Sequence, residues 1–460
     1  MGAEPWFELI AELRAENARL RAENAALRAE NEQLKKALQE ALARIEELER
    51  GGKRQAAPFG KDEQQKIPRE KHKKRGRKKG HRGANRPVPD HVDEEVVVPL
   101  HACPQCGGAV ENRQPITQYI EELPEIKPVV TRLTTFIGTC PCCGEVHSTH
   151  PLQTSFAIGA AKVMLGPQSL ANIVDLKTLG LSLRKISRVF SDLFHTKITV
   201  GGIQHILDRA AGKLEEYYAA LQEQIRASRV VYADETSWYV GERGHWLWVF
   251  TTPECTLYHV NSSRGGPIAE KILGADYSGV LVTDCHSGYL RFKCAQAKCI
   301  AHHLVRLKHC RKLPKTKDPT YLDAWRQLWK DVLSLHKARD GLSADAFDAA
   351  RAELERRFDT LLAQEVTQPG DQKFRTRMKN LGSHRLTCLY YEYVEATNNR
   401  AERAIRPAVI QRKISCGNRT AHGAHTWEVL TSLAVTAYQQ GRDFVRELAT
   451  QFLPIPVLAR

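Results

Sequence analysis

Two short apolar segments, each leading into an aspartate, constrain the fold of this chain more than any other feature. Residues 230–236 read Val-Val-Tyr-Ala-Asp-Glu-Thr, and residues 278–284 read Ser-Gly-Val-Leu-Val-Thr-Asp. Runs of this length and composition are typical of buried strands in an α/β sheet. If the strands lie side by side, Asp234 and Asp284 come close enough for their oxygens to bind hard divalent cations such as Mg²⁺. For either aspartate alone, a strand-end cap or turn is the simpler interpretation.

Further elements are expected around these two strands. Residues 245–251 and 256–261 are rich in aromatic and β-branched residues, which predicts a strand meander. Residues 311–390 are charged, with a few apolar anchors at helical spacing, so we expect an inserted helical subdomain. The anchors are Trp325, Trp329, Leu333 and Leu335.

Just before this insertion, Cys299 and His302 lie at a predicted strand-to-helix junction. A zinc site there would need two more ligands that the sequence does not identify, so buried packing is the favoured interpretation. His302, Arg306 and His309 share one helix face, which could meet phosphate or simply face solvent.

The N-terminal segment, residues 9–50, carries a heptad repeat. Most d positions hold leucine and three central a positions hold asparagine, with opposite charges between each g position and the next e position; this favours a parallel two-stranded coiled coil over a single surface helix. The d residues are Leu13, Leu20, Leu27, Leu34, Ala41 and Leu48, and the a residues are Ile10, Asn17, Asn24, Asn31, Leu38 and Ile45.

A basic linker follows. Residues 51–89 hold fourteen Lys and Arg against three Asp and Glu, a net +11 of the chain's formal +15. Such an imbalance points to a polyanion, and we expect a disordered segment that contacts DNA phosphates without reading sequence; a solvated tail is the alternative. The candidate phosphate contacts are Lys73, Lys74, Arg75, Arg77, Lys78, Lys79 and Arg82.

Two C-x-x-C knuckles, each followed by glycine, predict a zinc ribbon with structural Zn²⁺. Its four ligands are Cys103, Cys106, Cys140 and Cys143. Cys142 is then the spare thiol, although His147 or His150 could replace a cysteine ligand.

Residues 165–215 are predicted to be helical. A break near His195 and a possible cap at Thr199 give this stretch the outline of a helix-turn-helix. A helical hairpin packed on the core is nearly as consistent with the pattern.

Composition narrows the class of protein. A chain of 460 residues with 42% hydrophobic residues should form about two to four domains. Its N-terminus is charged and no apolar run reaches membrane-spanning length, so we expect a cytoplasmic, nucleoid-associated protein. In that compartment the twelve cysteines would be ligands or buried residues rather than disulfides.

The third acid lies within Thr-Asn-Asn-Arg-Ala-Glu-Arg-Ala-Ile-Arg-Pro, residues 397–407. Spacing alone does not choose among Glu402, Glu395 and Glu392, and Glu402 could instead cap or pair with nearby arginines. This string resembles the C-terminal signature of the insertion sequence 66 family of transposases. Asp-Glu-Thr at 234–236, Thr-Asp-Cys-His-Ser-Gly-Tyr at 283–289, the basic linker and the double knuckle are similar to that family, in the same order.

This resemblance implies a metal-dependent transposase on an RNase H-like core in which Asp234, Asp284 and Glu402 are the catalytic ligands of Mg²⁺ or Mn²⁺. Such an enzyme would bind terminal inverted repeats, cleave the element's ends and join them to target DNA, with the coiled coil pairing two protomers and accessory element-encoded proteins as possible partners. The polar loop at 411–420 would contact the DNA ends through Arg412, Lys413 and Arg419. A catalytically inactive zinc-dependent regulator and a nuclease without strand transfer are the alternatives.

The expected architecture is a multidomain α/β protein. Its predicted segments are a coiled coil (1–50), a basic linker (51–95), a zinc-ribbon DNA-binding domain (96–155), a helix-turn-helix region (156–225), the first part of the catalytic core (226–310), a helical insertion (311–390), the second part of the core with the Glu402 helix (391–440) and a C-terminal tail (441–460).

Overall fold

The computed structural model describes residues 15–35, 37–39, 86–112, 114–148, 150 and 163–452. The chain divides into two compact units, residues 1–120 and 121–460. The seven predicted phosphate contacts of the basic linker lie outside the described residues.

In the first unit, residues 15–35 and 37–39 are helical, as the heptad pattern predicts. The d-position leucines Leu20, Leu27 and Leu34 are exposed in the single chain. Exposed leucines at these positions are what a coiled coil would bury, and dimerisation through them remains a prediction.

A mixed five-stranded sheet forms the centre of the second unit, in the order β5-β4-β3-β6-β7. The first three strands along the chain pair antiparallel as a meander, as expected, and β6 and β7 then extend the sheet in parallel beyond β3. The strands are β3 Val230–Val240, β4 Arg243–Thr251, β5 Thr256–Asn261, β6 Val280–Thr283 and β7 Gln296–Lys298. The chain is thus a mixed α/β protein.

Alternation along the strands divides the core into two clusters. On β3, Val231 and Ala233 belong to one cluster, whereas Val230 and Tyr232 belong to the other. Because successive side chains of a strand point to opposite faces, Asp234 lies on the face of Val230 and Tyr232, and Glu235 lies on the opposite face.

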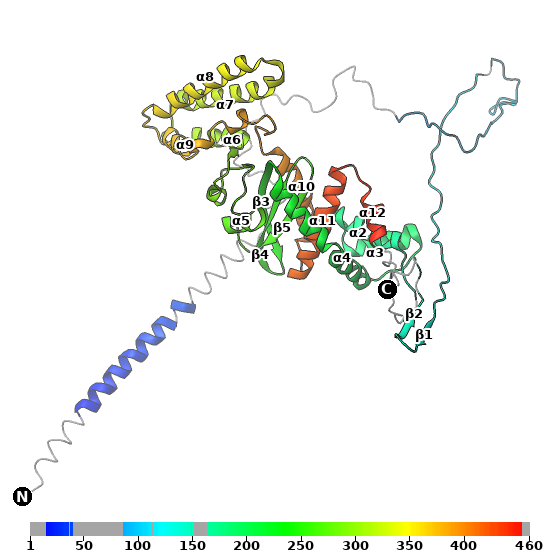
Figure 1. Cartoon of the computed structure of the whole chain (residues 1–460), viewed down its shortest axis with the longest axis horizontal. Helices are drawn as coiled ribbons and strands as arrows, with labels where there is room; N and C mark the ends of the chain where they lie inside the picture. Colours follow the sequence, from blue (N-terminus) through cyan, green and yellow to red (C-terminus); the bar gives the residue numbers. More distant parts are fainter. Residues whose placement is uncertain are drawn as a thin grey trace, which may run out of the picture. The chain divides into compact units, whose positions relative to one another are not determined.

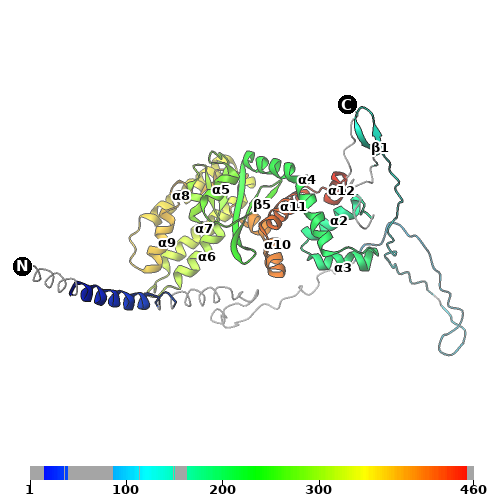
Figure 2. The same cartoon turned by 90° about the horizontal axis from the view of Figure 1, so that it is seen from below.

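One face of the sheet packs against one helix that connects two of its strands, α5, and against helices that flank the sheet in sequence (Figures 1 and 2). They are α2 Pro167–Thr178, α3 Leu183–Phe194, α4 Val200–Ala227, α5 Gly266–Leu273, α11 Ala421–Gln439 and α12 Phe444–Gln451. The break near His195 is present as a left-handed residue, and the Thr199 hydroxyl accepts a hydrogen bond from the Gly202 amide at 3.0 Å, which confirms the predicted cap. Whether α3 and α4 read DNA remains a prediction.

The other face packs against α10 Asn399–Ser415 and a group of helices from the insertion. These are α6 Ile300–Arg311, α7 Thr320–Ala338, α8 Ala344–Ala363 and α9 Pro369–Lys379, with the 3₁₀ turns η3 Arg339–Gly341, η4 Gly382–His384 and η5 Thr387–Leu389. The 3₁₀ turn η2 Ser287–Arg291 packs instead on the first face, against α5, through Tyr289. Trp325 and Trp329 are fully buried, so the anchors predicted for the insertion do form its core.

One expectation about local structure is wrong in part. Residues 411–420 were predicted to form a loop, but α10 continues to Ser415 and ends at Cys416 in a left-handed conformation. The helix persists because Gln411 points inward, where its side-chain oxygen accepts a hydrogen bond from the Trp427 indole at 2.9 Å. No helix in the described part of the chain is long and apolar enough to cross a membrane.

Candidate active site

The parallel pairing of β3 and β6 brings the two predicted aspartates to the same end of the sheet. Tyr232 is in register with Val282, and Asp234 and Asp284 each lie two residues further along. Val282 packs in the same cluster as Tyr232, so alternation gives both aspartates the same face. The Asp284 carboxylate also accepts a hydrogen bond from the His286 amide at 2.8 Å.

Glu402 comes to this face on the first turn of α10. Asn398, the residue before the helix, is fully buried and donates from Nδ2 to the carbonyl oxygen of Ala233 at 2.8 Å. Its own amide donates to Sγ of Cys299 at 3.1 Å, and its carbonyl accepts from the Glu402 amide at 3.1 Å. These bonds tie the start of the helix to the strand that carries Asp234.

Nearby acidic side chains affect the pKa of Asp234. Burial raises the pKa of Asp234 to about 7, and the neighbouring charges of Glu235, Asp284 and Glu402 contribute to the rise, while a hydrogen bond from the Glu235 amide opposes it. A carboxylate in such surroundings keeps its proton near neutral pH unless a cation compensates the charge. Asp234, Asp284 and Glu402 supply oxygen donors of the kind that Mg²⁺ or Mn²⁺ requires, so their chemistry fits such an ion, although their carboxylate oxygens do not all lie within 4.8 Å of one another in the described structure.

Geometry also separates Glu402 from the other acids that sequence left open. Glu395 precedes the helix, and one of its carboxylate oxygens accepts two hydrogen bonds from Arg400, at 2.8 and 3.0 Å. Glu392 is exposed. The ion pair found for Glu402 is with His302, at 3.8 Å between Oε1 and Nδ1, and not with an arginine of its own helix.

Sequence reasoning missed a buried network on the opposite face of β3. The Glu235 carboxylate, 1% exposed, accepts bonds from the Arg264 guanidinium at 2.8 and 3.0 Å and from the Tyr289 hydroxyl at 2.7 Å. The doublet Asp-Glu at the end of an apolar run was the available signal: consecutive strand residues face opposite ways, so the two acids necessarily have different surroundings.

Lys298, at the end of β7, is a second residue that sequence reasoning missed. It is buried, and its ammonium donates to the Thr283 hydroxyl at 2.8 Å, next to Asp284. Burial lowers the pKa of Lys298 to about 8, although the charges of Cys285 and Asp284 oppose the change. The Lys298 ammonium therefore lies close enough to Asp284 for the two charges to interact.

The predicted zinc knuckles each have a conformation suited to thiolate ligands. Backbone N–H groups of Gln105 and Cys106 lower the pKa of Cys103, and those of Cys142 and Cys143 lower the pKa of Cys140. The knuckle glycines take positive φ, +74° at Gly107 and +76° at Gly144 in the turn between β1 Ile137–Cys140 and β2 Gly144–His147. The two knuckles fall in different units, so a shared Zn²⁺ remains a prediction.

The residues expected to contact DNA ends differ in their surroundings. The Arg412 guanidinium is half-buried and donates to the hydroxyls of Thr236, at 3.1 Å, and Ser237, at 2.6 Å, so it fastens α10 to β3. Lys413 and Arg419 are exposed near the end of α10 and in the loop after it. Contact of any of them with DNA remains a prediction.

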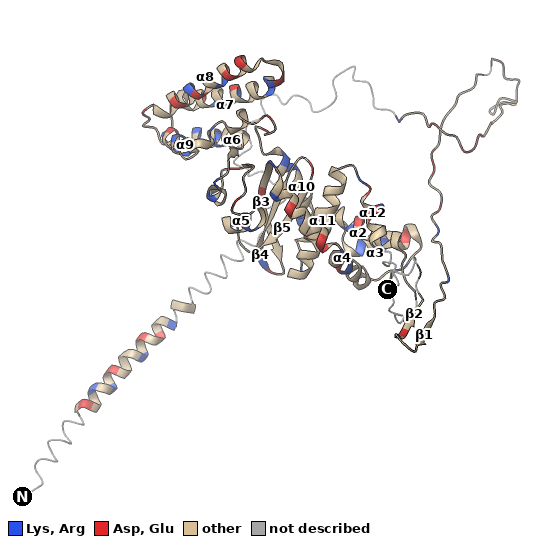
Figure 3. Ribbon diagram, viewed as in Figure 1, with Lys and Arg blue, Asp and Glu red and all other residues tan. Residues whose placement is uncertain are grey.

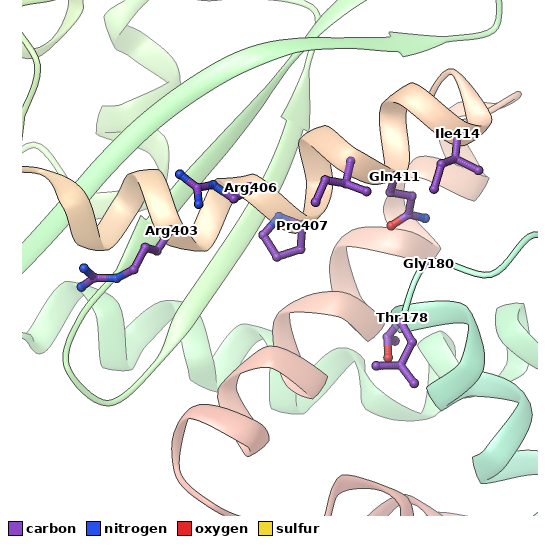
Figure 4. A pocket seen from close by; sticks show the side chains of 9 residues that line it. Thr178, Gly180, Arg403, Arg406, Pro407, Gln411 and Ile414 are labelled. Atoms are coloured by element: carbon purple, nitrogen blue, oxygen red, sulfur yellow. The ribbon is translucent and has the colours of Figure 1, made fainter. Parts of the chain in front are cut away.

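A pocket of about 280 Å³ lies along α10 beyond Glu402 (Figure 4). Two exposed arginines of this helix, Arg403 and Arg406, contribute to its lining, and neither has an ion-pair partner among the described residues. Its other lining residues are Thr178, Leu179, Gly180, Pro407, Ile410, Gln411 and Ile414.

Comparison with known proteins identifies the family of the chain. The sequence profile described as Transposase IS66 family matches residues 162–426, more than half of the chain. The chain belongs to the IS66 family of transposases. The matched range contains Asp234, Asp284 and Glu402 but not the heptads, the basic linker or the zinc knuckles.

Two curated proteins of Sinorhizobium fredii (strain NBRC 101917 / NGR234) are similar to this transposase. "Uncharacterized protein y4hP" is 23% identical over 409 residues, which cover 77% of this chain and 71% of the relative. "Uncharacterized protein y4qI" is 25% identical over 268 residues, which cover 48% of this chain and 47% of the relative. Membership of the family makes this chain an enzyme that acts on DNA, and DNA its partner.

Proposed function

We propose that this transposase cleaves DNA at the ends of its element and joins the freed ends to target DNA, using Mg²⁺ or Mn²⁺ held by Asp234, Asp284 and Glu402. The observation that carries the proposal is the parallel pairing of β3 and β6, which brings Asp234 and Asp284 to the same end of the sheet; burial, together with the charges of Glu235, Asp284 and Glu402, then raises the pKa of Asp234 to about 7. Three carboxylates from three distant segments of the chain, gathered at one end of a sheet, have little structural use without a cation.

The sheet supports an RNase H-like interpretation of the core, since a meander is extended by parallel strands and acids follow the strand ends. Divalent ions bound there would polarise the scissile phosphate, promote attack by water or a 3′-hydroxyl and stabilise the leaving oxygen. Asp234 and Asp284 hold fixed positions through the sheet, while Asn398 holds the Glu402 helix against them. The chain's own part is therefore to keep the three ligands aligned through cleavage and strand transfer.

Basic side chains near the site support a path for DNA. The packed helices α6 and α9 carry basic residues (Figure 3). Among them, Lys308, Lys373 and Lys379 are exposed without an ion-pair partner among the described residues. On α10, Arg403 and Arg406 extend from the helix that carries Glu402 (Figure 4). We infer that both groups hold phosphates on either side of the scissile bond.

The N-terminal segments complete the proposal. The zinc ribbon, the helix-turn-helix and the basic linker would recognise the terminal inverted repeats, and the coiled coil would bring two protomers to two ends. Structural Zn²⁺ and a dimer are parts of this proposal rather than properties of the described structure.

The test uses labelled element ends and a target plasmid with Mg²⁺. Wild-type protein is expected to yield 3′-hydroxyl ends and joined products, and Asp234→Asn is expected to lose both while still binding the ends. Glu392→Gln is the matched control, because Glu392 is exposed and its charge does not act on Asp234. Binding without any Mg²⁺-dependent nicking by wild type would favour the inactive regulator, and nicking without joined products would favour a nuclease.

A further inference from the structure

A second group of potential metal ligands, Cys299, His302 and Glu402, shares Glu402 with the three proposed carboxylate ligands of Mg²⁺. Sγ of Cys299, a ring nitrogen of His302 and a carboxylate oxygen of Glu402 all lie within 4.8 Å of one another. Their positions follow from the fold: Cys299 lies between β7 and α6, His302 lies on the first turn of α6, and Glu402 lies on the first turn of α10.

The His302 ring provides a second, independent observation. Its Nδ1 atom is buried and makes no hydrogen bond of ordinary length among the described residues; the groups that approach the ring are Glu402, with Oε1 at 3.8 Å, and the side chain of Cys299. Buried polar atoms in proteins are nearly always satisfied, so an unpartnered nitrogen aimed at a carboxylate and a thiol calls for an explanation. A bound cation would supply the missing partner.

The donor chemistry narrows the identity of that cation. A thiolate, an imidazole and a carboxylate are the ligands of Zn²⁺, at about 2.3 Å for sulfur and about 2.0–2.2 Å for nitrogen and oxygen. Ligands at those distances around a tetrahedral ion are roughly 3.3–3.7 Å apart, so the present separations need to contract by about an ångström. Mg²⁺ does not favour sulfur, which sets this group apart from the three carboxylates.

Access to the group is open from one side. The side chains of His302 and Glu402 are each 41% exposed, whereas Cys299 is fully buried beneath them. An ion can therefore enter past the histidine and the glutamate and meet the sulfur at the base of the site. Three protein ligands leave a fourth position for water or another small ligand.

We propose that Cys299, His302 and Glu402 form a binding site for Zn²⁺ that shares one ligand, Glu402, with the catalytic ions. Zn²⁺ in this site takes Glu402 from the carboxylate cluster and inhibits Mg²⁺-dependent DNA cleavage. The inhibition rests on the proposed function, whereas the Zn²⁺ binding does not.

Binding is tested first, on the full-length protein, without any measure of activity. Metal-free protein is titrated with Co²⁺ as a probe for Zn²⁺, and the thiolate charge-transfer absorption and bound equivalents are recorded. Cys299→Ser and His302→Asn are each expected to bind one equivalent fewer per chain than wild type. Cys416→Ser, which replaces an exposed cysteine outside the group, should bind as many as wild type, and Asp234→Asn should keep the contribution of Cys299 to the thiolate charge-transfer absorption.

The regulatory consequence is tested by adding Zn²⁺ to the cleavage reaction in Mg²⁺, with each variant compared with its own rate without Zn²⁺. Wild-type cleavage is expected to fall roughly tenfold when free Zn²⁺ is about ten times its Kd, and Cys299→Ser should resist this inhibition. If wild type and Cys299→Ser bind the same number of Co²⁺ ions per chain, the proposed Zn²⁺ site does not exist. If Cys299→Ser binds fewer Co²⁺ ions but Zn²⁺ inhibits its cleavage as strongly as that of wild type, the site exists but does not regulate cleavage. If Asp234→Asn still cleaves DNA, the proposed function is wrong and the Zn²⁺ site is unaffected.

Discussion

The side-chain amide of Asn398 donates a 2.8 Å hydrogen bond to the carbonyl oxygen of Ala233, a residue 165 positions earlier in the chain. Ala233 immediately precedes Asp234 on β3, and Asn398 immediately precedes the helix that carries Glu402. This buried hydrogen bond therefore joins β3, which carries Asp234, to the start of α10, which carries Glu402.

Removing this bond should weaken both stability and catalysis. Asn398→Ala leaves the Ala233 carbonyl unsatisfied in the core, so the free energy of unfolding should fall by about 1–3 kcal/mol. DNA cleavage should fall by more than DNA binding, because the change acts on the position of Glu402. Denaturant unfolding and end cleavage check this, with the exposed neighbour as control: Asn399→Ala should match wild type in both.

The pKa of Asp234, about 7, predicts how metal binding depends on pH. Between about pH 4 and pH 7 the folded metal-free protein holds a proton on Asp234 that the unfolded chain has already lost, so metal-free stability falls as pH rises through this window. Mg²⁺ needs the carboxylate, so its affinity should rise about tenfold per pH unit below 7 and level off above. Calorimetric Mg²⁺ titrations at pH 6, 7 and 8 measure this, and a flat profile would contradict it.

Glu235 is predicted to act on Asp234 without binding metal. Its charge is the largest contribution after burial to the raised pKa of Asp234. Glu235→Gln should therefore move the midpoint of the Mg²⁺ affinity profile to lower pH. It should also destabilise the fold by about 1–3 kcal/mol, because Arg264 loses its charged partner. An unchanged midpoint would exclude this electrostatic role.

The arginines beside the pocket on α10 are predicted to bind DNA phosphates. Replacing both Arg403 and Arg406 with alanine should weaken binding to element ends, and the slope of log K against log salt should become shallower by about 0.9 for each phosphate that the variant no longer neutralises. Arg356→Ala is the control, since Arg356 lies on α8 in a local ion pair with Glu353. If the double variant kept the wild-type slope, this helix face would not be part of the DNA path.

Much of the catalytic core could be predicted because its signals are local. Apolar runs ending in acid, a β-branched meander and tryptophans at helical spacing correspond to β3, β6, β4, β5 and the core of the insertion. The parallel neighbour relationship of β3 and β6 was a hypothesis, since sequence alone does not report which strands pair. The extent of α10 was wrong at its end because Gln411 is stabilised by Trp427, a tertiary contact.

The surroundings of the acids could not be predicted for the same reason. Glu392, Glu395 and Glu402 are the same type of residue, so only their contacts distinguish them. Arg400 forms an ion pair with Glu395, whereas the His302 ring approaches Glu402. The sequence did not identify a third ligand for Cys299 and His302, because that residue, Glu402, comes 100 residues after His302. Long-range contacts of this kind appear only once the sheet and α10 are assembled.

The central claim is that Asp234, Asp284 and Glu402 together bind the catalytic divalent ion, and Mn²⁺ binding followed by electron paramagnetic resonance tests it most directly. Asp234→Asn, Asp284→Asn and Glu402→Gln are each expected to weaken Mn²⁺ affinity at least about tenfold, because each removes one charged ligand, while Glu392→Gln binds as wild type does. Wild-type affinity in the Glu402→Gln protein would contradict the claim.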